Sequence, residues 1–269
     1  MQALLNTAIK AARKAGDFAQ MNFGRINEGD IRTKDYNEFV TFVDDQAEIL
    51  IKDIIQSRYP DHEIIAEESK PKKNDKSDYV WIIDPLDGTT NYIHSFPVYA
   101  VSIALKVKGL LEVSVIYDPS RQELFTAIRG AGSQLDGRRI RVSKQRTLEG
   151  ALLGTGFPYR QNNDWLDIYL EIFSDFSQKA AGIRRPGAAA LDLAYVACGR
   201  LDGFWEFGLN SWDVAAGILL IQESGGLFSN LIPNQDMLES GNIIAGNQRV
   251  FGEMKKIISK YDSKLVQLS

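Results

Sequence analysis

The sequence has little cysteine and no long apolar run, and these absences bound the class of protein. Cys198 is the single cysteine among 269 residues, so the chain cannot form an internal disulfide, and a lone thiol suits a reducing compartment. No apolar run approaches the ~20 residues that a membrane-spanning helix needs. The first residues also lack the basic-then-apolar order of a signal peptide. We therefore expect a soluble, cytoplasmic protein that does not associate with membranes.

An excess of basic charge is missing too. The formal net charge is −4, which argues against binding to free nucleic acid, so we expect no direct nucleic-acid partner. The sequence also has no internal repeat, no low-complexity segment and no Pro/Gly/Ser-rich linker. The chain is therefore predicted to fold as one cooperative body.

The most informative stretch is DPLDGTTN, residues 84–91, which follows an apolar run that reads as a strand. Pro85 and Gly88 favour a turn here, so Asp84 and Asp87 are expected to project from the end of the strand into one pocket. Two carboxylates that close repel each other unless a cation lies between them. Oxygen-only ligands favour Mg²⁺, which commonly recruits a substrate phosphate.

Two further acids extend this interpretation. Glu67 closes a second strand-like run, and Asp213 lies at the start of a helix in WDVAAG, residues 212–217, where it either caps the helix or reaches into a site. Four such acids suit two or more divalent cations, which polarise a phosphoryl group and activate water. Ordinary Asp-Pro and Asp-Gly turns are the simpler alternative. A simple turn, however, does not require a second strand that ends in acids.

Three motifs in this order, EES (67–69), DPLDGTT (84–90) and WDVAAG (212–217), resemble the inositol monophosphatase family, and most closely its bacterial SuhB-type branch. The resemblance is collinear over nearly the whole chain. It implies a five-layer αβαβα sandwich, an α+β/α/β fold of the inositol monophosphatase and sugar phosphatase type. It further implies a homodimer with two or three Mg²⁺ ions, with Mn²⁺ as a substitute and Li⁺ as an inhibitor.

The resemblance also assigns metal ligands and catalytic groups. The implied metal ligands are Glu67, Asp84, Asp87, Asp213 and the backbone carbonyl of Leu86. Glu67 also counts among the catalytic residues, together with Thr89 and Asp44, a pair that would activate the attacking water. Asp44 has an alternative role as a cap of the helix that begins near it. Lys34 matches a lysine on a loop that closes over the site, and its alternative is an ordinary solvated side chain.

The substrate is expected to contact residues from both halves of the chain. Residues 187–190 read as a loop entering a helix, whose free N–H groups can bind an oxygen-rich ligand. Glu206 resembles the family's acceptor of a substrate hydroxyl, although an outward-facing polar residue on an alternating strand is the alternative. The complete expected substrate-binding set is Asp87, Gly88, Thr89, Gly187, Ala188, Ala189, Glu206 and Asp213.

Hydrophobic periodicity divides the chain into an α+β half, residues 1–145, and an α/β half, residues 146–269. The first half should hold an antiparallel sheet and most metal ligands, and the second should hold Asp213 and the substrate-binding residues. The elements expected in the first half are helices at 4–19 and 43–55, a polar loop at 70–78, and strands at 99–106, 112–117 and 123–128. Those expected in the second half are strands at 151–154, 204–207, 226–229 and 242–245, and helices from Asp164, after Gly187, at 212–223 and from Gln248.

The function that the resemblance implies is Mg²⁺-dependent hydrolysis of a phosphorylated polyol, myo-inositol monophosphate, by metal-activated water. A haloacid-dehalogenase-type phosphatase is disfavoured, because it needs an aspartate two residues before Asp87 and Pro85 stands there. A same-fold phosphatase for fructose-1,6-bisphosphate, histidinol phosphate, NADP or a 3'-phosphoadenosine nucleotide stays open. So does a SuhB-like regulator that binds the transcription or RNA-processing machinery.

Overall fold

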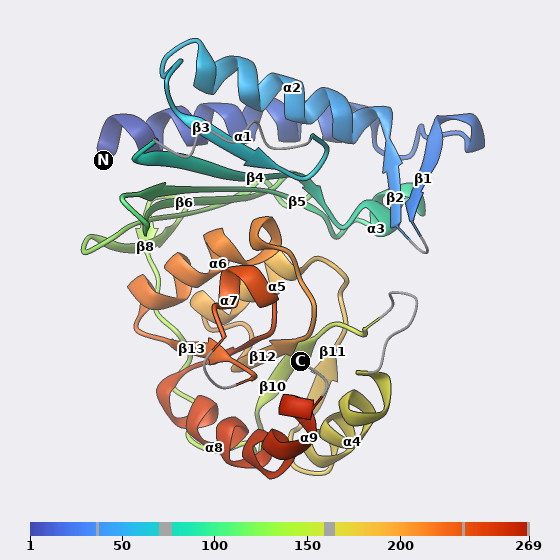
Figure 1. The fold of residues 1–269 in the computed structure, drawn as a ribbon, viewed down its shortest axis with the longest axis vertical. Coiled ribbons are helices and arrows are strands. Elements are labelled where there is room, and N and C mark those ends of the chain that lie inside the picture. The colour runs from blue at the N-terminus through green and yellow to red at the C-terminus, as the bar shows by residue number, and fades with distance from the viewer. Residues whose placement is uncertain (36–37, 70–76, 159–164, 233–234, 268–269) are drawn as a thin grey trace.

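Five layers of secondary structure make up the protein (Figure 1). The computed structural model describes residues 1–35, 38–69, 77–158, 165–232 and 235–267. Helices form the two outer layers and the middle layer, and two β-sheets lie between them, so the expected αβαβα sandwich is confirmed. Most of the loop expected at 70–78, and the expected helix start at Asp164, lie outside the described residues. Within the described ranges, no helix is long and apolar enough to cross a membrane.

The first helical layer consists of α1 (Gln2–Asn22) and α2 (Phe42–Gln56), as the periodicity predicts. One face of α1 is a stripe of fully buried alanines, and such small side chains let a helix pack closely on its neighbours. Helix α2 begins with a capping box between Thr41 and Asp44. The chain between the two helices forms η1 (Glu28–Asp30) and the antiparallel hairpin of β1 (Ile31–Asp35) and β2 (Glu38–Thr41).

The first sheet has seven strands in the order β3-β4-β5-β6-β7-β8-β9. Strands β3 and β4 are parallel, and every later pair is antiparallel. The short connections from β5 to β7 predict this pairing for those three strands. The strands are β3 (Glu63–Ala66), β4 (Tyr79–Asp87), β5 (Ala100–Val107), β6 (Leu110–Asp118), β7 (Glu123–Ile128), β8 (Gly132–Leu135) and β9 (Arg138–Arg139).

The middle layer, α5 (Ala189–Ala197) and α6 (Ser211–Ser224), is buried between the two sheets. Three serines of the first sheet donate hydrogen bonds to α6 carbonyl oxygens spaced four residues apart. These are Ser102 Oγ to Trp212 O (3.2 Å), Ser114 Oγ to Ala216 O (2.7 Å) and Ser133 Oγ to Leu220 O (2.7 Å). Residues four apart lie on one face of a helix, so the serines hold that face of α6 against the sheet.

The second sheet has five strands in the order β11-β10-β12-β14-β13, and the last helical layer covers its far side (Figure 1). The strands are β10 (Leu152–Thr155), β11 (Gly182–Arg184), β12 (Gly203–Glu206), β13 (Leu227–Asn230) and β14 (Ile243–Gly246). The last layer is α4 (Leu166–Ser177), α8 (Gln248–Ile258), η2 (Ser259–Tyr261) and α9 (Asp262–Gln267). Two short helices, α3 (Thr89–Ile93) and α7 (Met237–Ser240), lie in connections.

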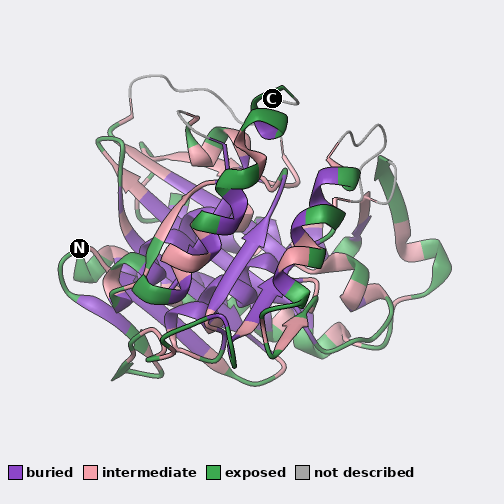
Figure 2. Ribbon diagram, turned by 90° about the horizontal axis from the view of Figure 1, so that it is seen from below, coloured by how far each residue is buried: buried purple, intermediate pink, exposed green. Residues whose placement is uncertain are grey.

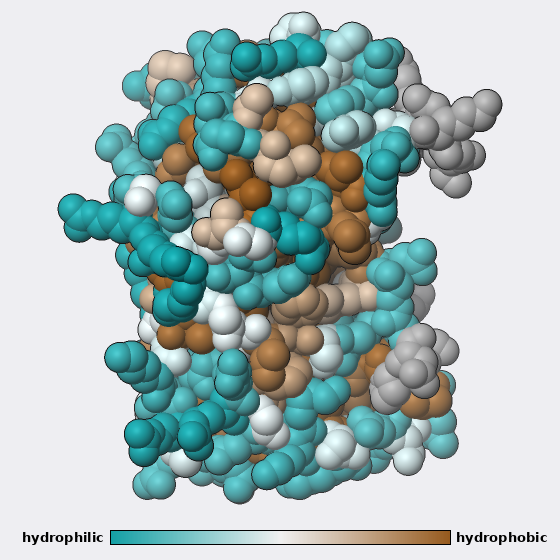
Figure 3. All heavy atoms as spheres, turned by 90° about the vertical axis from the view of Figure 1, so that its left-hand side faces the viewer, coloured by the Kyte–Doolittle hydropathy of each residue, from teal (hydrophilic) through white to brown (hydrophobic). Residues whose placement is uncertain are grey.

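One hydrophobic cluster joins both halves of the chain. It includes Ile116 and Phe125 of the first sheet, most of α5 and α6, and Phe204 of the second sheet. Buried residues accordingly lie along the inner strands and helices (Figure 2). On the face shown in Figure 3, hydrophobic side chains gather near the middle and hydrophilic ones surround them. This shared core supports the expectation of one cooperative body, which stays a prediction.

Candidate active site

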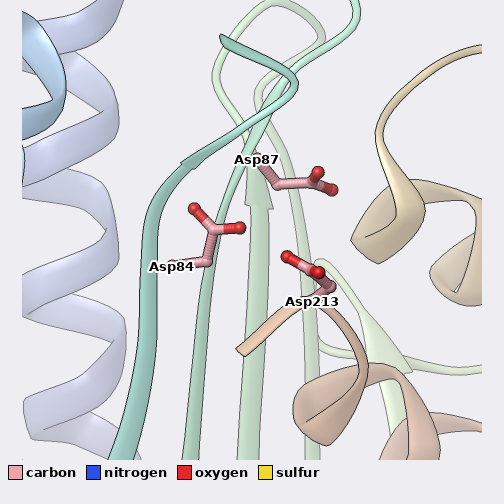
Figure 4. Close-up of side chains that lie close together, drawn as sticks. All are labelled: Asp84, Asp87 and Asp213. Carbon is pink, nitrogen blue, oxygen red and sulfur yellow. The ribbon is translucent and has the colours of Figure 1, made fainter. Parts of the chain in front are cut away.

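Three carboxylates converge where the first sheet meets the middle layer. Asp84 and Asp87 lie at the end of β4, and Asp213 lies in the first turn of α6. Each offers an oxygen within 4.8 Å of the other two, and Figure 4 shows the three side chains pointing toward one another. The structure therefore brings together three of the four acids that the sequence proposes as metal ligands.

A β-bulge at Pro85 and Leu86, followed by the expected turn at Gly88, presents the two acids of β4. The pairing of β4 with β5 shifts between Asp84 and Asp87, so Pro85 and Leu86 together stand opposite the single residue Val101, which makes a bulge of one extra residue. Proline has no N–H to donate to a ladder, which suits this position. The Leu86 N–H donates to Asp84 Oδ1 (2.9 Å) and fixes that carboxylate.

Gly88 ends the bulged strand in a conformation that needs glycine. Its φ is 95°, and a Cβ there would lie 2.8 Å from the carbonyl oxygen of Val98. Helix α3 begins at the next residue, Thr89. The left-handed turn therefore places the start of α3 beside the carboxylates of β4.

Asp213 fulfils both roles that the sequence allowed. Its Oδ2 accepts a 2.6 Å hydrogen bond from the N–H of Asn210, in a capping box that starts α6. Its carboxylate also belongs to the three-acid cluster. Capping therefore fixes the side chain in the orientation that the cluster requires.

Glu67 lines the same cavity but does not belong to the three-carboxylate group. Its Oε1 lies 3.2 Å from the Lys34 ammonium, which also pairs with Glu68. Lys34 lies on strand β1 rather than on a loop. Burial lowers the pKa of Lys34, but its two carboxylate neighbours outweigh burial, and the net pKa is raised. Lys34 therefore stays charged at the rim of the site.

The electrostatics of the acids fit a bound cation. Burial raises the pKa values of Asp84 and Asp87 well above their usual range, and the neighbouring carboxylates raise them further. Burial likewise raises the pKa of Glu67 to about 7, although the charge of Lys34 opposes the shift. Crowded, buried carboxylates of this kind are stabilised by a multivalent cation. Because all the donors are oxygens, the set suits a hard ion such as Mg²⁺.

Asp44 and Thr89 form the pair that the resemblance implies. Asp44 is fully buried, and its Oδ1 accepts a 2.9 Å hydrogen bond from the Thr89 hydroxyl. Its Oδ2 accepts from the N–H (2.8 Å) and hydroxyl (2.6 Å) of Thr41, so Asp44 also caps α2. Burial raises the pKa of Asp44, and the bonds from Thr41 and Thr89 oppose that shift. The Leu86 carbonyl oxygen lies 3.1 Å from the same Thr89 hydroxyl.

The remaining proposed substrate residues line a cavity of about 730 Å³ that also contains the carboxylates. They are Gly88, Gly187, Ala188, Ala189 and Glu206. Asn91 Nδ2 donates to the carbonyl oxygens of Pro186 (2.9 Å) and Gly187 (3.2 Å), which ties this loop to the first half of the chain. The N–H of Ala190 donates to Asp87 Oδ2 (2.7 Å). One N–H at the start of α5 therefore holds a carboxylate of the acidic cluster.

Among the cavity residues that sequence reasoning missed, two are important for its chemistry, Asp192 and Gly156. Asp192 is fully buried, and its Oδ1 has no hydrogen-bond partner among the described residues. Burial raises its pKa well above the usual range, and the charges of Glu206 and Asp87 raise it further. An acid inside the apolar run after Gly187 was the signal that could have identified it. Arg185 also lines the cavity.

We expect Mg²⁺ to stabilise the protein more strongly at higher pH. The metal-free folded protein keeps a proton on Glu67 up to about pH 7, whereas the unfolded chain loses it at lower pH. The metal-free protein therefore loses stability as the pH rises through this window. A cation must displace these protons, so the increase in Tm on adding Mg²⁺ should be larger at about pH 8 than at about pH 5.5. Equal increases in differential scanning fluorimetry would contradict this.

Replacing Asp84 by Asn should raise the Tm of the metal-free protein and remove most of the Mg²⁺-dependent increase. The amide keeps the size of the side chain but removes one charge from a cluster whose members repel. A rise of a few degrees is expected, because ~1 kcal/mol corresponds to roughly 2–4 °C in large domains. The exposed Asp78, which lies directly before β4 and outside any helix, provides the matched control, Asp78→Asn, which should change neither value. A lower metal-free Tm for Asp84→Asn would show that protein contacts already balance its charge.

Comparison with known proteins agrees with this geometry. The model of the inositol monophosphatase family matches residues 1–263. The Nus factor SuhB of Pseudomonas aeruginosa is 53% identical over 254 residues, which cover 93% of this chain and 94% of that protein.

Solved structures of related proteins also resemble this chain over nearly its whole length. The extragenic suppressor protein suhB of Bartonella henselae superposes with a TM-score of 0.91 at 40% identity, covering 96% of this chain and 99% of that chain. Inositol monophosphatase-II of Staphylococcus aureus, solved with inositol monophosphate bound, superposes with a TM-score of 0.82 at 26% identity, covering 99% and 97%. It has also been solved with 2'-AMP bound. The chain therefore belongs to the inositol monophosphatase family.

Proposed function

We propose that the protein is a Mg²⁺-dependent phosphomonoesterase that hydrolyses myo-inositol monophosphate to myo-inositol and phosphate. The observation that carries this proposal is the meeting, in one cavity, of three carboxylates with the hydrogen-bonded pair of Thr89 and Asp44. The first set suits cations that hold a phosphate, and the second can take a proton from water. Family membership supports phosphatase chemistry.

The acidic residues would hold two or three ions, with Mn²⁺ able to replace Mg²⁺. We assign Glu67, Asp84, Asp87, Asp213 and the carbonyl oxygen of Leu86 as the ligands. When bound, such ions polarise a phosphoryl group and lower the pKa of water. Lys34, which already reaches Glu67, would close the cavity over the phosphate. Gly88 and Thr89, at the start of α3, would offer backbone N–H groups to the phosphate oxygens.

Thr89 and Asp44 would move the proton of the attacking water. Because the Thr89 hydroxyl donates to Asp44 Oδ1, its oxygen keeps lone pairs that can accept a hydrogen bond from water. As water attacks phosphorus, its proton would pass to Thr89 Oγ1 and the threonine proton to Asp44. Burial, which raises the pKa of Asp44, favours this transfer. Water would attack directly, without a phosphoenzyme, so the bond between phosphorus and the inositol oxygen would break as the new P–O bond forms, and the leaving alkoxide would take a proton from solvent.

The alcohol would lie against the other side of the cavity. Glu206 would accept a hydrogen bond from a ring hydroxyl, and the backbone from Gly187 to Ala189 would line the ring. The staphylococcal relative solved with inositol monophosphate supports this substrate. The same relative has been solved with 2'-AMP bound. Nucleotide phosphates, and the other substrates of this fold, therefore stay as alternatives.

A substrate panel tests the proposal. Purified protein with Mg²⁺ should release phosphate faster from myo-inositol 1-phosphate than from fructose-1,6-bisphosphate, histidinol phosphate, NADP or a 3'-phosphoadenosine nucleotide. Asp84→Asn should abolish the release. Li⁺ should inhibit it, because a singly charged ion in a Mg²⁺ position would stabilise the leaving alkoxide less well. Preference for another member of the panel would overturn the assignment of inositol as the substrate, but the proposal of phosphatase activity would stand.

Thr89→Val should lower kcat by about 10²–10⁴-fold, the usual contribution of a group that transfers a proton. Valine keeps the branched shape and removes the hydroxyl. The Mg²⁺-dependent increase in Tm should persist, because Thr89 contributes no carboxylate to the acidic cluster. Loss of that increase would instead mean that Thr89 supports the metal site through the Leu86 carbonyl.

Glu206→Gln should lower kcat/KM for myo-inositol 1-phosphate by about 5- to 30-fold, which corresponds to ~1–2 kcal/mol for the lost charge on a hydrogen-bond acceptor. The loss should be smaller for glycerol 2-phosphate, whose shorter alcohol we do not expect to reach Glu206. Initial rates on both substrates give the two ratios. Equal losses would indicate that Glu206 supports the metal site rather than the ring.

A second role is proposed on a separate observation, the high identity to relatives named Nus factor SuhB. The protein would also bind the transcription machinery as a regulator, acting in the cytoplasm as a homodimer. Affinity purification from lysate should recover RNA polymerase subunits with both wild type and the catalytically inactive Asp84→Asn. If neither protein recovers RNA polymerase subunits, the result would contradict this regulatory role and leave the phosphatase proposal unaffected.

A further inference from the structure

Gly156 and Glu206 lie side by side at the ends of two parallel strands. Thr155, the last residue of β10, pairs with Trp205 of β12, so the next residues along the chain are neighbours. A Cβ added to Gly156 would overlap the carboxyl carbon and both oxygens of Glu206. The carboxylate of Glu206 therefore occupies the space that any side chain at position 156 would take.

The backbone does not explain this glycine. Gly88 and Gly187, which also line the cavity, have φ values of 95° and 89°, which disfavour other residues. Gly156 is not among the glycines with positive φ. Its conformation therefore permits alanine, and the lack of a side chain matters only for the space that it leaves.

Glu206 has few alternative positions within the cavity. It is 7% exposed, and the buried carboxyl groups of Asp192 and Asp87 lie near enough for its charge to act on both. A carboxylate displaced from Gly156 would have to approach one of these acids or leave its buried position. Approach to Asp192 or Asp87 raises the repulsion between like charges. In either case the hydrogen-bond acceptor of Glu206 moves away from its position beside Gly156.

We infer that Gly156 determines substrate specificity, because its missing side chain creates the space that places the Glu206 carboxylate in the alcohol end of the cavity. Gly156 is a positioning residue that acts through Glu206. The inference rests on the proposed function, in which Glu206 accepts a hydrogen bond from the substrate alcohol. It adds that the identity of residue 156 decides where this acceptor lies.

A double-mutant cycle on the full-length protein with Mg²⁺ tests the inference. Gly156→Ala should lower the ratio of kcat/KM for myo-inositol 1-phosphate to that for glycerol 2-phosphate by about 5- to 30-fold, mainly through KM, as expected for a lost charged acceptor. In a Glu206→Ala background, where the space is empty, Gly156→Ala should change the ratio no further. Gly252→Ala, at a glycine of α8 with nothing within 4 Å of the added Cβ, is the matched control.

A loss of the same size in the Glu206→Ala background would overturn the inference, because Gly156 would then act independently of Glu206. A crystal structure of Gly156→Ala provides a readout that does not depend on the substrate, and should show the Glu206 carboxylate displaced. An unmoved carboxylate would overturn the inference whichever phosphate ester the enzyme prefers. Failure of wild type to hydrolyse myo-inositol 1-phosphate, with Glu206 displaced in the variant, would refute only the proposed substrate.

Discussion

The attachment of helix α6 to the seven-stranded sheet is the interaction on which the candidate site depends. Ser102, Ser114 and Ser133 come from three strands and bond carbonyl oxygens along one face of the helix. These bonds fix both the rotation and the position of α6 along its axis. Asp213 follows directly after the first of the bonded carbonyls, so its carboxylate is carried to the bulged end of β4, opposite Asp84. The site is thus a consequence of packing between the two halves of the chain.

The same junction places acids where burial opposes their charge. The α5 N–H of Ala190 stabilises Asp87 with one hydrogen bond, but burial and neighbouring carboxylates still raise its pKa. A protein built for stability alone would place apolar residues in such a position. Departures from that rule are expected at functional sites, where a ligand supplies the missing stabilisation. The structure therefore supports a site whose acids are balanced when a cation is present.

Much of this arrangement was predictable from local signals. Periodic apolar residues marked the helices, and the motif around Asp84 placed acids at the end of a strand. The bulge at Pro85 was not predictable, because it depends on the register between β4 and β5. Asp192 and Gly156 were missed for a related reason. Their importance arises from what faces them across strands and helices that are distant in the sequence, and no pattern along the chain reports that neighbourhood.

The spacing of the serine contacts limits how α6 can change in evolution or in engineering. A helix turns by about 100° per residue, so deleting one residue between Trp212 and Ala216 would leave a helix but rotate its first turn. Either the serine bonds would hold downstream and Asp213 would face away from β4, or Asp213 would keep its place and the bonds would break. At the start of α6, substitutions can therefore accumulate, whereas insertions and deletions cannot, because they break the match between the serine contacts and the position of Asp213.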